Sequence, residues 1–308
     1  MRVGGALVSV VVPTYERTDL LARALRSVLA QTHRPLEILV VDDASPTDPR
    51  HRVPELEHTS VRYLRHEENR GAAVARNTGI EAASGELVAF LDSDDEWLPE
   101  KIEAQVAALE GAPKDTGLVS CGVLFADEGG RKYGRRAVVP PDPYRKLLEE
   151  NFVGSTSVAL LPRHVLEKVG GFDRKLPSSQ DHDLWLRVTR GHDLAAAPAP
   201  LVRMHVDLAR PRISSDARAK RAGTKRMLEK HGEEMRRHGV RHLYLRNQGR
   251  FFASRASGDV AGARRLYRDS LRDRPLAPAT WLWLAATFLP RSLFDPVARF
   301  ARARRSGS

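Results

Sequence analysis

The chain has 308 residues, enough for one large α/β domain with an appendage or for two small domains with their own cores. Its single cysteine, Cys121, excludes an internal disulfide and a cysteine-based zinc site, and no secretion signal is visible near its start, so a cytoplasmic location is expected. The net charge of +11 lies mostly beyond about residue 200 and predicts an anionic partner there: a membrane surface fits, whereas nucleic acid is not expected because its binding motifs are missing.

Four short apolar segments alternate with helical patterns over the first part of the chain. The predicted strands are residues 8–12, 36–41, 61–64 and 87–91, with helices after the first, third and fourth of them. A strand, a helix and a further strand make a parallel pair, so the repeated pattern predicts a doubly wound half-sheet. Neither a dinucleotide-binding glycine pattern nor a Walker-type loop is present, so a phosphate group would have to be held in another way.

The fourth predicted strand ends in an acidic cluster, Asp92, Ser93, Asp94 and Asp95. The carboxyl ends of parallel strands are where open α/β sheets bind their ligands. Neighbouring carboxylates repel one another, and a bound Mg²⁺ or Mn²⁺ would relieve that repulsion. The alternative is a solvated acidic turn before a helix that has Pro99 at its first position.

The pattern is looser after residue 117. The expected elements are strands at 118–125, 157–161 and 202–205, a hairpin or loop at 131–139, and a short helix at 162–169. Asp181 and Asp183 begin an amphipathic helix, where an aspartate is also a common cap. His205 ends the last strand, and a lone histidine of this kind is more often a hydrogen-bonded structural residue than a metal ligand.

The chain turns helical and basic after residue 210. Residues 259–267 resemble one helix of an αα-hairpin, and residues 281–290 are strongly apolar but half as long as a bilayer crossing requires. This apolar stretch could lie in a membrane interface or pack against the preceding helices, and the sequence leaves both open. The predicted domains are residues 1–212 and a basic helical region at 213–308.

Several motifs in the first domain follow one another in a specific order. They are Val-Pro-Thr-Tyr-Glu, Val-Val-Asp-Asp-Ala-Ser, Asn-Arg-Gly-Ala-Ala-Val-Ala-Arg-Asn-Thr-Gly, Leu-Asp-Ser-Asp-Asp, Gly-Gly-Phe-Asp and Gln-Asp-His-Asp-Leu-Trp-Leu-Arg. In this order they resemble the family 2 glycosyltransferases of the GT-A fold, over about residues 8–215. The resemblance implies a mixed, mainly parallel sheet flanked by helices, here with a helical C-terminal appendage.

The resemblance also implies the reaction and the site. An inverting transferase would move a sugar from a nucleotide-diphosphate donor, expected to be a uridine diphosphate sugar, to a hydroxyl of the acceptor. The acceptor would be a glycan or a lipid-linked molecule in cell-surface polysaccharide assembly, at the inner membrane face. By resemblance, Asp181 is the catalytic base. The expected donor-binding residues are Pro13, Thr14, Tyr15, Asp43, Arg76, Asp92, Ser93 and Asp94, and the expected ligands of Mn²⁺ or Mg²⁺ are Asp94, Asp95 and His205.

Two alternatives stay open, and a departure from the family supports the first of them. Gln180 stands where the family usually has glutamate, which removes a charge beside Asp181. A binding protein that keeps the sheet but does not turn over is therefore one alternative. A sugar nucleotidyltransferase is the other, although such enzymes are expected to have a glycine-rich, lysine-bearing loop after the first strand and this chain has none.

Overall fold

The computed structural model describes residues 5–126, 132–205, 216–254 and 257–289. The chain divides into two compact units. The first comprises residues 1–144, 152–176 and 180–210, and the second comprises residues 145–151, 177–179 and 211–308.

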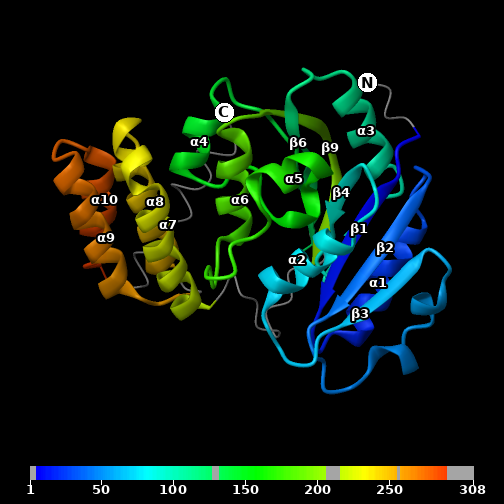
Figure 1. Ribbon diagram of the computed structural model, residues 1–308. Helices are drawn as coiled ribbons and strands as arrows, with labels where there is room; N and C mark the ends of the chain where they lie inside the picture. The colour runs from blue at the N-terminus through cyan, green and yellow to red at the C-terminus, as the bar shows by residue number, and fades with distance from the viewer. Residues whose placement is uncertain (1–4, 127–131, 206–215, 255–256, 290–308) are drawn as a thin grey trace. The chain divides into compact units, whose positions relative to one another are not determined.

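The described strands of the first unit form one mixed sheet with the order β3-β2-β1-β4-β8-β6-β9-β5, and β7 pairs with β6 (Figure 1). Neighbours from β3 to β4 are parallel, as are β6 and β9, whereas β8, β7 and β5 pair antiparallel. This architecture confirms the predicted α/β sheet. The strands are β1 (Val8–Thr14), β2 (Leu36–Asp42), β3 (Val61–Arg65), β4 (Leu87–Phe90), β5 (Asp95–Trp97), β6 (Thr116–Ala126), β7 (Lys132–Arg135), β8 (Leu160–Pro162) and β9 (Asp193–His205).

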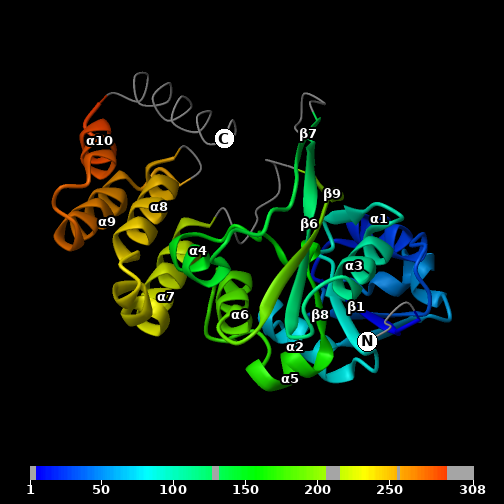
Figure 2. The same ribbon diagram turned by 90° about the horizontal axis from the view of Figure 1, so that it is seen from above.

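Helices cover both faces of this sheet. Figure 2 shows α1 and α3 on one side and α2 and α6 on the other. The helix α2 approaches β1 closely because it has Gly79 at the contact, where an added Cβ would overlap Cγ1 of Val11. The helices of this unit are α1 (Thr18–Leu29), α2 (Ala72–Ala82), α3 (Lys101–Glu110), α5 (Arg163–Val169) and α6 (Gln180–Thr189), with the 3-10 turns η1 (Pro49–His51), η2 (Pro54–Glu57) and η3 (Thr156–Val158).

The central strands end together at one edge of the sheet. Every residue of β1 and β4 is buried, as expected for runs of Val, Leu, Ala and Phe covered by helices on both faces. Thr14 lies opposite Asp42 in the register, and Val11 lies opposite Phe90. The polar segments that follow these three strands therefore leave the sheet at the same edge.

Residues 95–97 differ from the prediction. They form β5, which pairs antiparallel with Val202–Met204 of β9, and α3 begins at Lys101, so Pro99 is not its first residue. The strand was missed because its pairing partner lies about a hundred residues away, and a three-residue strand has no pattern of its own. The strand predicted at 202–205 is the end of the longer β9, whose Ala and Pro residues at 195–200 have low β-propensity.

Lys101 is fully buried in the first unit. Its ammonium nitrogen lies 3.8 Å from the centre of the Trp97 ring. Among the described residues, this nitrogen has no hydrogen-bond partner. Burial lowers the pKa of Lys101 to about 7, against a smaller opposing effect of Cys121.

Replacing Lys101 with methionine is expected to stabilise the fold and to flatten its alkaline stability profile. Because the pKa in the folded protein is about 7 and the ordinary value is 10.5, the unfolded chain holds a proton between these pH values that the folded chain has lost. Stability of the wild type therefore rises with pH in this window, by up to about 1.4 kcal/mol per pH unit from this group. Below about pH 7, the folded protein keeps the charge on Lys101 buried and bears its full cost in folding free energy.

Urea unfolding of the wild type and Lys101→Met between about pH 6 and pH 10.5 measures this difference. The exposed Lys114 provides the control, since Lys114→Met should unfold with the wild-type pH profile. Parallel profiles for wild type and Lys101→Met would contradict a lysine that loses its proton on folding.

The second unit is helical. Its helices are α4 (Pro143–Glu149), which begins in the first unit, α7 (Ala217–Arg237), α8 (Arg241–Ala253), α9 (Val260–Asp273) and α10 (Pro278–Ala286). A small core of Phe252, Ala253, Ala263, Tyr267 and Ala286 joins α8, α9 and α10. Asp259 caps α9 by accepting a hydrogen bond from the backbone N–H of Gly262 at 2.9 Å. Over the described ranges, none of the helices has the length and apolar content that crossing a bilayer demands.

Candidate active site

In the acidic segment after β4, the carboxylates of Asp92, Asp94 and Asp95 each contact a different side chain. Arg76 Nη2 lies 2.6 Å from Oδ1 of Asp92, and Arg17 Nη1 lies 2.9 Å from Oδ2 of Asp94. Asp95 is buried and accepts a hydrogen bond from Ser157 Oγ at 2.7 Å. Positive charge from two different elements therefore reaches this segment, α2 through Arg76 and the start of α1 through Arg17.

Arg76 joins the acidic segment to the start of α6. Its Nη1 donates to Oε1 of Gln180 at 3.2 Å, while Nε2 of Gln180 donates to the carbonyl of Leu176 at 2.7 Å. The next residue is Asp181, half-buried in the first turn of α6, whose Oδ1 accepts a hydrogen bond from the N–H of His182 at 2.8 Å. The carboxylate of Asp92 and that of Asp181 thus belong to segments that a single buried arginine connects.

The same arginine sets the charge state of Asp92. Burial works to raise the pKa of Asp92, but the charge of Arg76, its hydrogen bond and a hydrogen bond from Thr156 outweigh it, so the pKa lies below its ordinary value. Thr156 Oγ1 donates to Oδ1 of Asp92 at 3.0 Å. Asp92 is therefore an ionised, fixed acceptor.

Asp43 follows β2 and organises the turn into α2. Its carboxylate accepts hydrogen bonds from the N–H of Arg70 at 3.0 Å and of Gly71 at 2.7 Å, and Oδ1 lies 2.7 Å from Nδ1 of His66. Gly71 has a φ of 88°, which favours glycine there. The N–H of Asp43 donates to the carbonyl of Thr14 at 2.9 Å, so the ends of β1 and β2 are tied together.

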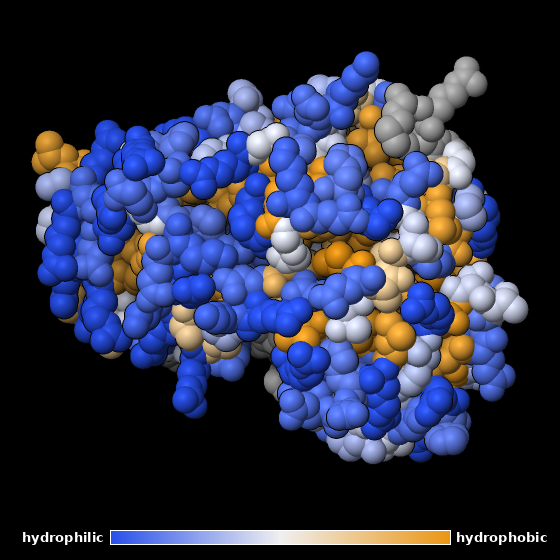
Figure 3. Space-filling model, viewed as in Figure 1, coloured by the Kyte–Doolittle hydropathy of each residue, from blue (hydrophilic) through white to orange (hydrophobic). Residues whose placement is uncertain are grey.

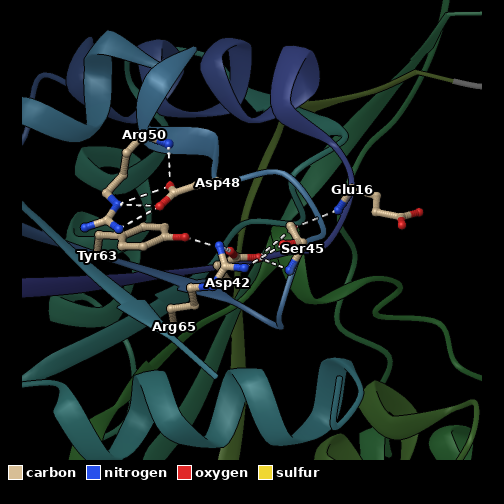
Figure 4. A network of polar contacts seen from close by, with 7 residues as sticks. All are labelled: Glu16, Asp42, Ser45, Asp48, Arg50, Tyr63 and Arg65. Atoms are coloured by element: carbon tan, nitrogen blue, oxygen red, sulfur yellow. Dashed lines mark hydrogen bonds and ion pairs between the residues drawn. The ribbon is translucent and has the colours of Figure 1, made fainter. Parts of the chain in front are cut away.

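A polar network around Asp42 shapes the adjacent loops (Figure 4). Oδ2 of Asp42 accepts hydrogen bonds from Tyr63 at 2.6 Å and Arg65 at 3.1 Å, and Oδ1 accepts one from Ser45 Oγ at 2.5 Å. Ser45 Oγ also accepts a hydrogen bond from the N–H of Glu16 at 3.0 Å. Burial, reinforced by Asp42, raises the pKa of the Tyr63 hydroxyl, which stays a donor. The network joins the loop after β1, which contains Tyr15, to the loop after β2.

Glu96, which the sequence reasoning did not single out, contacts the expected site residue His205. It lies on β5 and contacts Nε2 of His205 at the end of β9, because β5 and β9 pair. Burial works to raise the pKa of Glu96, but the bond and charge of His205, with Arg203 and Arg23, lower it below the ordinary value. No sequence signal marks this contact, since it depends on a register between strands about a hundred residues apart.

The expected metal ligands do not form one preassembled cluster. In the part of the chain that the structure describes, no three His, Cys, Asp or Glu side chains are grouped closely enough to hold an ion. Asp94, Asp95 and His205 have different partners, namely Arg17, Ser157 and Glu96. Carboxylates that are not clustered suit Mg²⁺ or Mn²⁺, which binds through one or two protein carboxylates and takes further ligands from substrate phosphates. The residues present therefore fit an ion that arrives with a diphosphate.

The remaining expected residues lie on the same edge. Pro13 and Thr14 are buried at the end of β1, Tyr15 is 39% exposed just beyond it, and Ser93 is buried within the acidic segment. The structure brings together Arg17 with Asp94, Arg76 with Asp92 and Gln180, and Thr14 with Asp43. Carboxylates and arginines that alternate in this way can hold an anionic, metal-bound ligand and can place a carboxylate beside it.

Comparison with known proteins identifies the family. The pattern of "Glycosyl transferase family 2" matches residues 9–170. The UDP-Glc:alpha-D-GlcNAc-diphosphoundecaprenol beta-1,3-glucosyltransferase WfgD of Escherichia coli is 30% identical over 210 residues, covering 68% of this chain and 80% of WfgD. The putative teichuronic acid biosynthesis glycosyltransferase TuaG of Bacillus subtilis is 45% identical over 104 residues, 32% of this chain and 40% of TuaG.

Two solved structures share the fold. Residues 1–349 of TarS from S. aureus, in complex with UDP-GlcNAc, superpose with a TM-score of 0.58 at 18% identity, covering 96% of this chain and 87% of that one. The mannosyltransferase PcManGT from Pyrobaculum calidifontis, in complex with GDP-Man and Mn2+, superposes with a TM-score of 0.58 at 20% identity, covering 98% and 84%. Because the family pattern matches over half of its length, the chain belongs to glycosyl transferase family 2 and is a glycosyltransferase.

Proposed function

We propose that the protein transfers a sugar from a uridine diphosphate donor to a hydroxyl of a lipid-linked acceptor, with inversion at the sugar carbon, and that a divalent metal is required. The observation that carries this proposal is the position of Arg76, which bonds both Asp92 of the acidic segment and Gln180 beside Asp181. These two contacts support a site in which donor-binding groups and a base would lie on connected segments, as a single displacement requires.

The donor would lie along the edge where β1, β2 and β4 end. Pro13, Thr14, Tyr15 and Asp43 would flank the base and ribose, and Arg76, Asp92, Ser93 and Asp94 would surround the ribose and diphosphate. The partly exposed ring of Tyr15 offers a stacking surface for the base. TarS, which has the same fold, was crystallised with UDP-GlcNAc, and this supports uridine as the base.

Asp94, Asp95 and His205 would hold Mn²⁺ or Mg²⁺ together with the donor phosphates. A metal there acts as a Lewis acid that stabilises the charge of the departing nucleoside diphosphate. Mn2+ in the complex of PcManGT supports this part of the proposal. Arg17 pairs with the carboxylate of Asp94, so its guanidinium would lie close to a diphosphate held there.

Asp181 would take the proton from the acceptor hydroxyl as the sugar carbon is attacked. Its place in the first turn of α6 is set by Gln180, whose side chain is fixed between Arg76 and the carbonyl of Leu176. The amide of Gln180 thus bonds Arg76 without adding a second negative charge. Asp92 keeps the charge of Arg76 balanced.

The names of the relatives support a proposal for the acceptor and the location. WfgD, by its name, acts on a diphosphoundecaprenol-linked sugar, and TuaG is named a putative teichuronic acid biosynthesis glycosyltransferase. We propose that this protein likewise extends a lipid-linked glycan in cell-surface polysaccharide assembly, as a peripheral protein on the cytoplasmic side of the membrane.

Replacing Glu96 with alanine is expected to weaken Mn²⁺ binding in the presence of UDP by about 10- to 100-fold, because Glu96 holds Nε2 of His205 and so orients the ring. Electron paramagnetic resonance titration of Mn²⁺ measures the affinity directly. The exposed Glu100 supplies the control, and Glu100→Ala should bind Mn²⁺ as the wild type does. If Glu96→Ala binds Mn²⁺ with unchanged affinity, either His205 does not bind the metal or Glu96 does not orient it.

The donor is tested by a thermal-shift panel of nucleotide sugars with and without Mn²⁺. A ligand at 100 times its dissociation constant stabilises the folded state by about 2.7 kcal/mol, which raises the melting temperature measurably. A shift with one uridine diphosphate sugar that depends on Mn²⁺ is expected. Equal melting temperatures across the panel would contradict a donor site.

A further inference from the structure

The helix α10 and its two flanks expose large apolar side chains. Among the described residues, eight large hydrophobic side chains are exposed, and five of them lie within residues 276–289. Their exposed fractions are 90% for Leu276, 53% for Trp281, 72% for Leu282, 63% for Phe288 and 44% for Leu289. In Figure 3 an apolar group is visible at the left edge of the surface, over the connection between α9 and α10, within hydrophilic surroundings. So large a share of the exposed apolar side chains in one short segment marks an interaction surface.

This exposure is a property of a folded, docked helix. Ala286 is buried in the core of the second unit, and Trp283 and Leu284 pack against that core. The indole N–H of Trp281 donates to the carbonyl of Pro275 at 2.8 Å, which fixes the ring in its exposed position. One side of α10 is therefore already used for packing, and the other side presents Trp281 and Leu282 outward.

Arginines accompany this apolar face. The guanidinium of Arg264 lies 3.8 Å from the centre of the Phe288 ring, and its Nη2 donates to the carbonyl of Thr287 at 2.7 Å. The guanidinium of Arg250 lies 5.1 Å from the centre of the Trp283 ring. Residues 274–289 contain no acidic residue, and residues 216–289 contain 17 Lys and Arg against 7 Asp and Glu. The apolar face thus belongs to a strongly basic unit.

We propose that the exposed face of Leu276, Trp281, Leu282, Phe288 and Leu289 docks the protein on an anionic lipid bilayer. Exposed tryptophan, leucine and phenylalanine side chains on α10 and its flanks, with Arg264 beside Phe288, match the depth profile of a bilayer surface, where acyl chains lie beneath phosphates. A second copy of this chain would instead bring another strongly basic unit against the first. Charge complementarity therefore favours anionic lipid over self-association.

This inference deepens the proposed function, because a lipid-linked acceptor is confined to the bilayer surface. It needs neither donor nor metal. Docking and sugar transfer can therefore fail independently in experiments, since vesicle binding is measured without any nucleotide sugar and donor turnover is measured without any vesicle.

The test is co-sedimentation of the full chain with vesicles of phosphatidylglycerol and phosphatidylethanolamine, compared with phosphatidylcholine vesicles, at low salt. We expect binding to the anionic vesicles, little binding to the neutral ones, and loss of binding as salt rises. The double variant Leu282→Glu with Leu289→Glu should bind at least about 10-fold more weakly, because it places two charges in the apolar face.

The matched control is Val138→Glu, since Val138 is 72% exposed, as Leu282 is, but lies in the first unit. Its vesicle binding should equal that of the wild type, and the melting temperatures of all three proteins should agree. Brominated acyl chains should quench tryptophan fluorescence in the wild type and less in Trp281→Phe. The proposal is overturned if the wild type does not bind anionic vesicles at low salt, or if the double variant binds them as well as the wild type does. If the protein forms a dimer that the double variant disrupts and Val138→Glu does not, the face binds a second copy instead.

Discussion

Replacing Asp181 with asparagine is expected to lower kcat for sugar transfer by about 10²- to 10⁴-fold, the range that a positioned general base contributes. Asparagine has nearly the same shape but cannot accept the proton of the acceptor hydroxyl. Its side-chain oxygen can still accept the hydrogen bond from the N–H of His182, so the first turn of α6 should be unchanged. Dissociation constants for UDP and the donor should stay at the wild-type values, because the donor would bind to the loops after β1, β2 and β4.

The kinetic constants separate the base from a structural role. Initial rates against donor and acceptor give kcat and KM, and calorimetric titration with UDP gives the donor affinity. A loss in kcat with unchanged UDP affinity supports the assignment. If Asp181→Asn transfers sugar at the wild-type rate, another group takes the proton. A large rise in the UDP dissociation constant would instead place Asp181 in donor binding.

Replacing Asp94 with alanine is expected to abolish the metal-dependent part of donor binding, weakening UDP affinity in the presence of Mn²⁺ by about 10²-fold, or ~2.7 kcal/mol. The carboxylate of Asp94 pairs with Arg17, whose guanidinium can turn to a diphosphate. Asp92 and Asp95, by contrast, are fixed by Arg76 and Ser157. We therefore expect the carboxylate of Asp94 to bind the metal ion in place of the Arg17 guanidinium.

Chelation of the metal provides the internal comparison. Calorimetric titration with UDP should show the same weak affinity for wild type with chelator, for Asp94→Ala with Mn²⁺ and for Asp94→Ala with chelator. The exposed Asp193 gives the matched control, and Asp193→Ala should keep the Mn²⁺ effect. If Mn²⁺ still strengthens UDP binding to Asp94→Ala as in the wild type, the ion is held elsewhere.

The parts of the fold that the sequence predicted are those with a local cause. The buried runs of β1, β2 and β4 and the apolar faces of the helices between them are contiguous in the chain, and they gave the half-sheet and the edge where its polar loops lie. The acidic segment and Arg76 could be chosen because motifs of the family mark them. The roles of these residues remain predictions of the proposed function.

The parts that were missed depend on contacts between distant segments. The strand β5 exists because β9 runs beside it, and Glu96 reaches His205 for the same reason. The partners of Asp42, namely Ser45, Tyr63 and Arg65, come from two elements and have no common spacing. The pairing of Arg17 with Asp94 likewise joins residues that are 77 positions apart in the numbering. Periodicity and composition contain no information on such pairings, which depend on how distant segments come together in the fold.

The central claim is that this edge of the sheet binds a nucleotide-diphosphate sugar with a metal and cleaves its sugar bond. Incubation with labelled uridine diphosphate sugars and Mn²⁺, with products separated by chromatography, tests it directly. We predict slow release of UDP and free sugar without an acceptor, faster release with a lipid-linked acceptor, and loss of both in Asp181→Asn. Conversion of the donor and added pyrophosphate into nucleoside triphosphate and sugar phosphate, or binding of the donor without any turnover, would contradict the account.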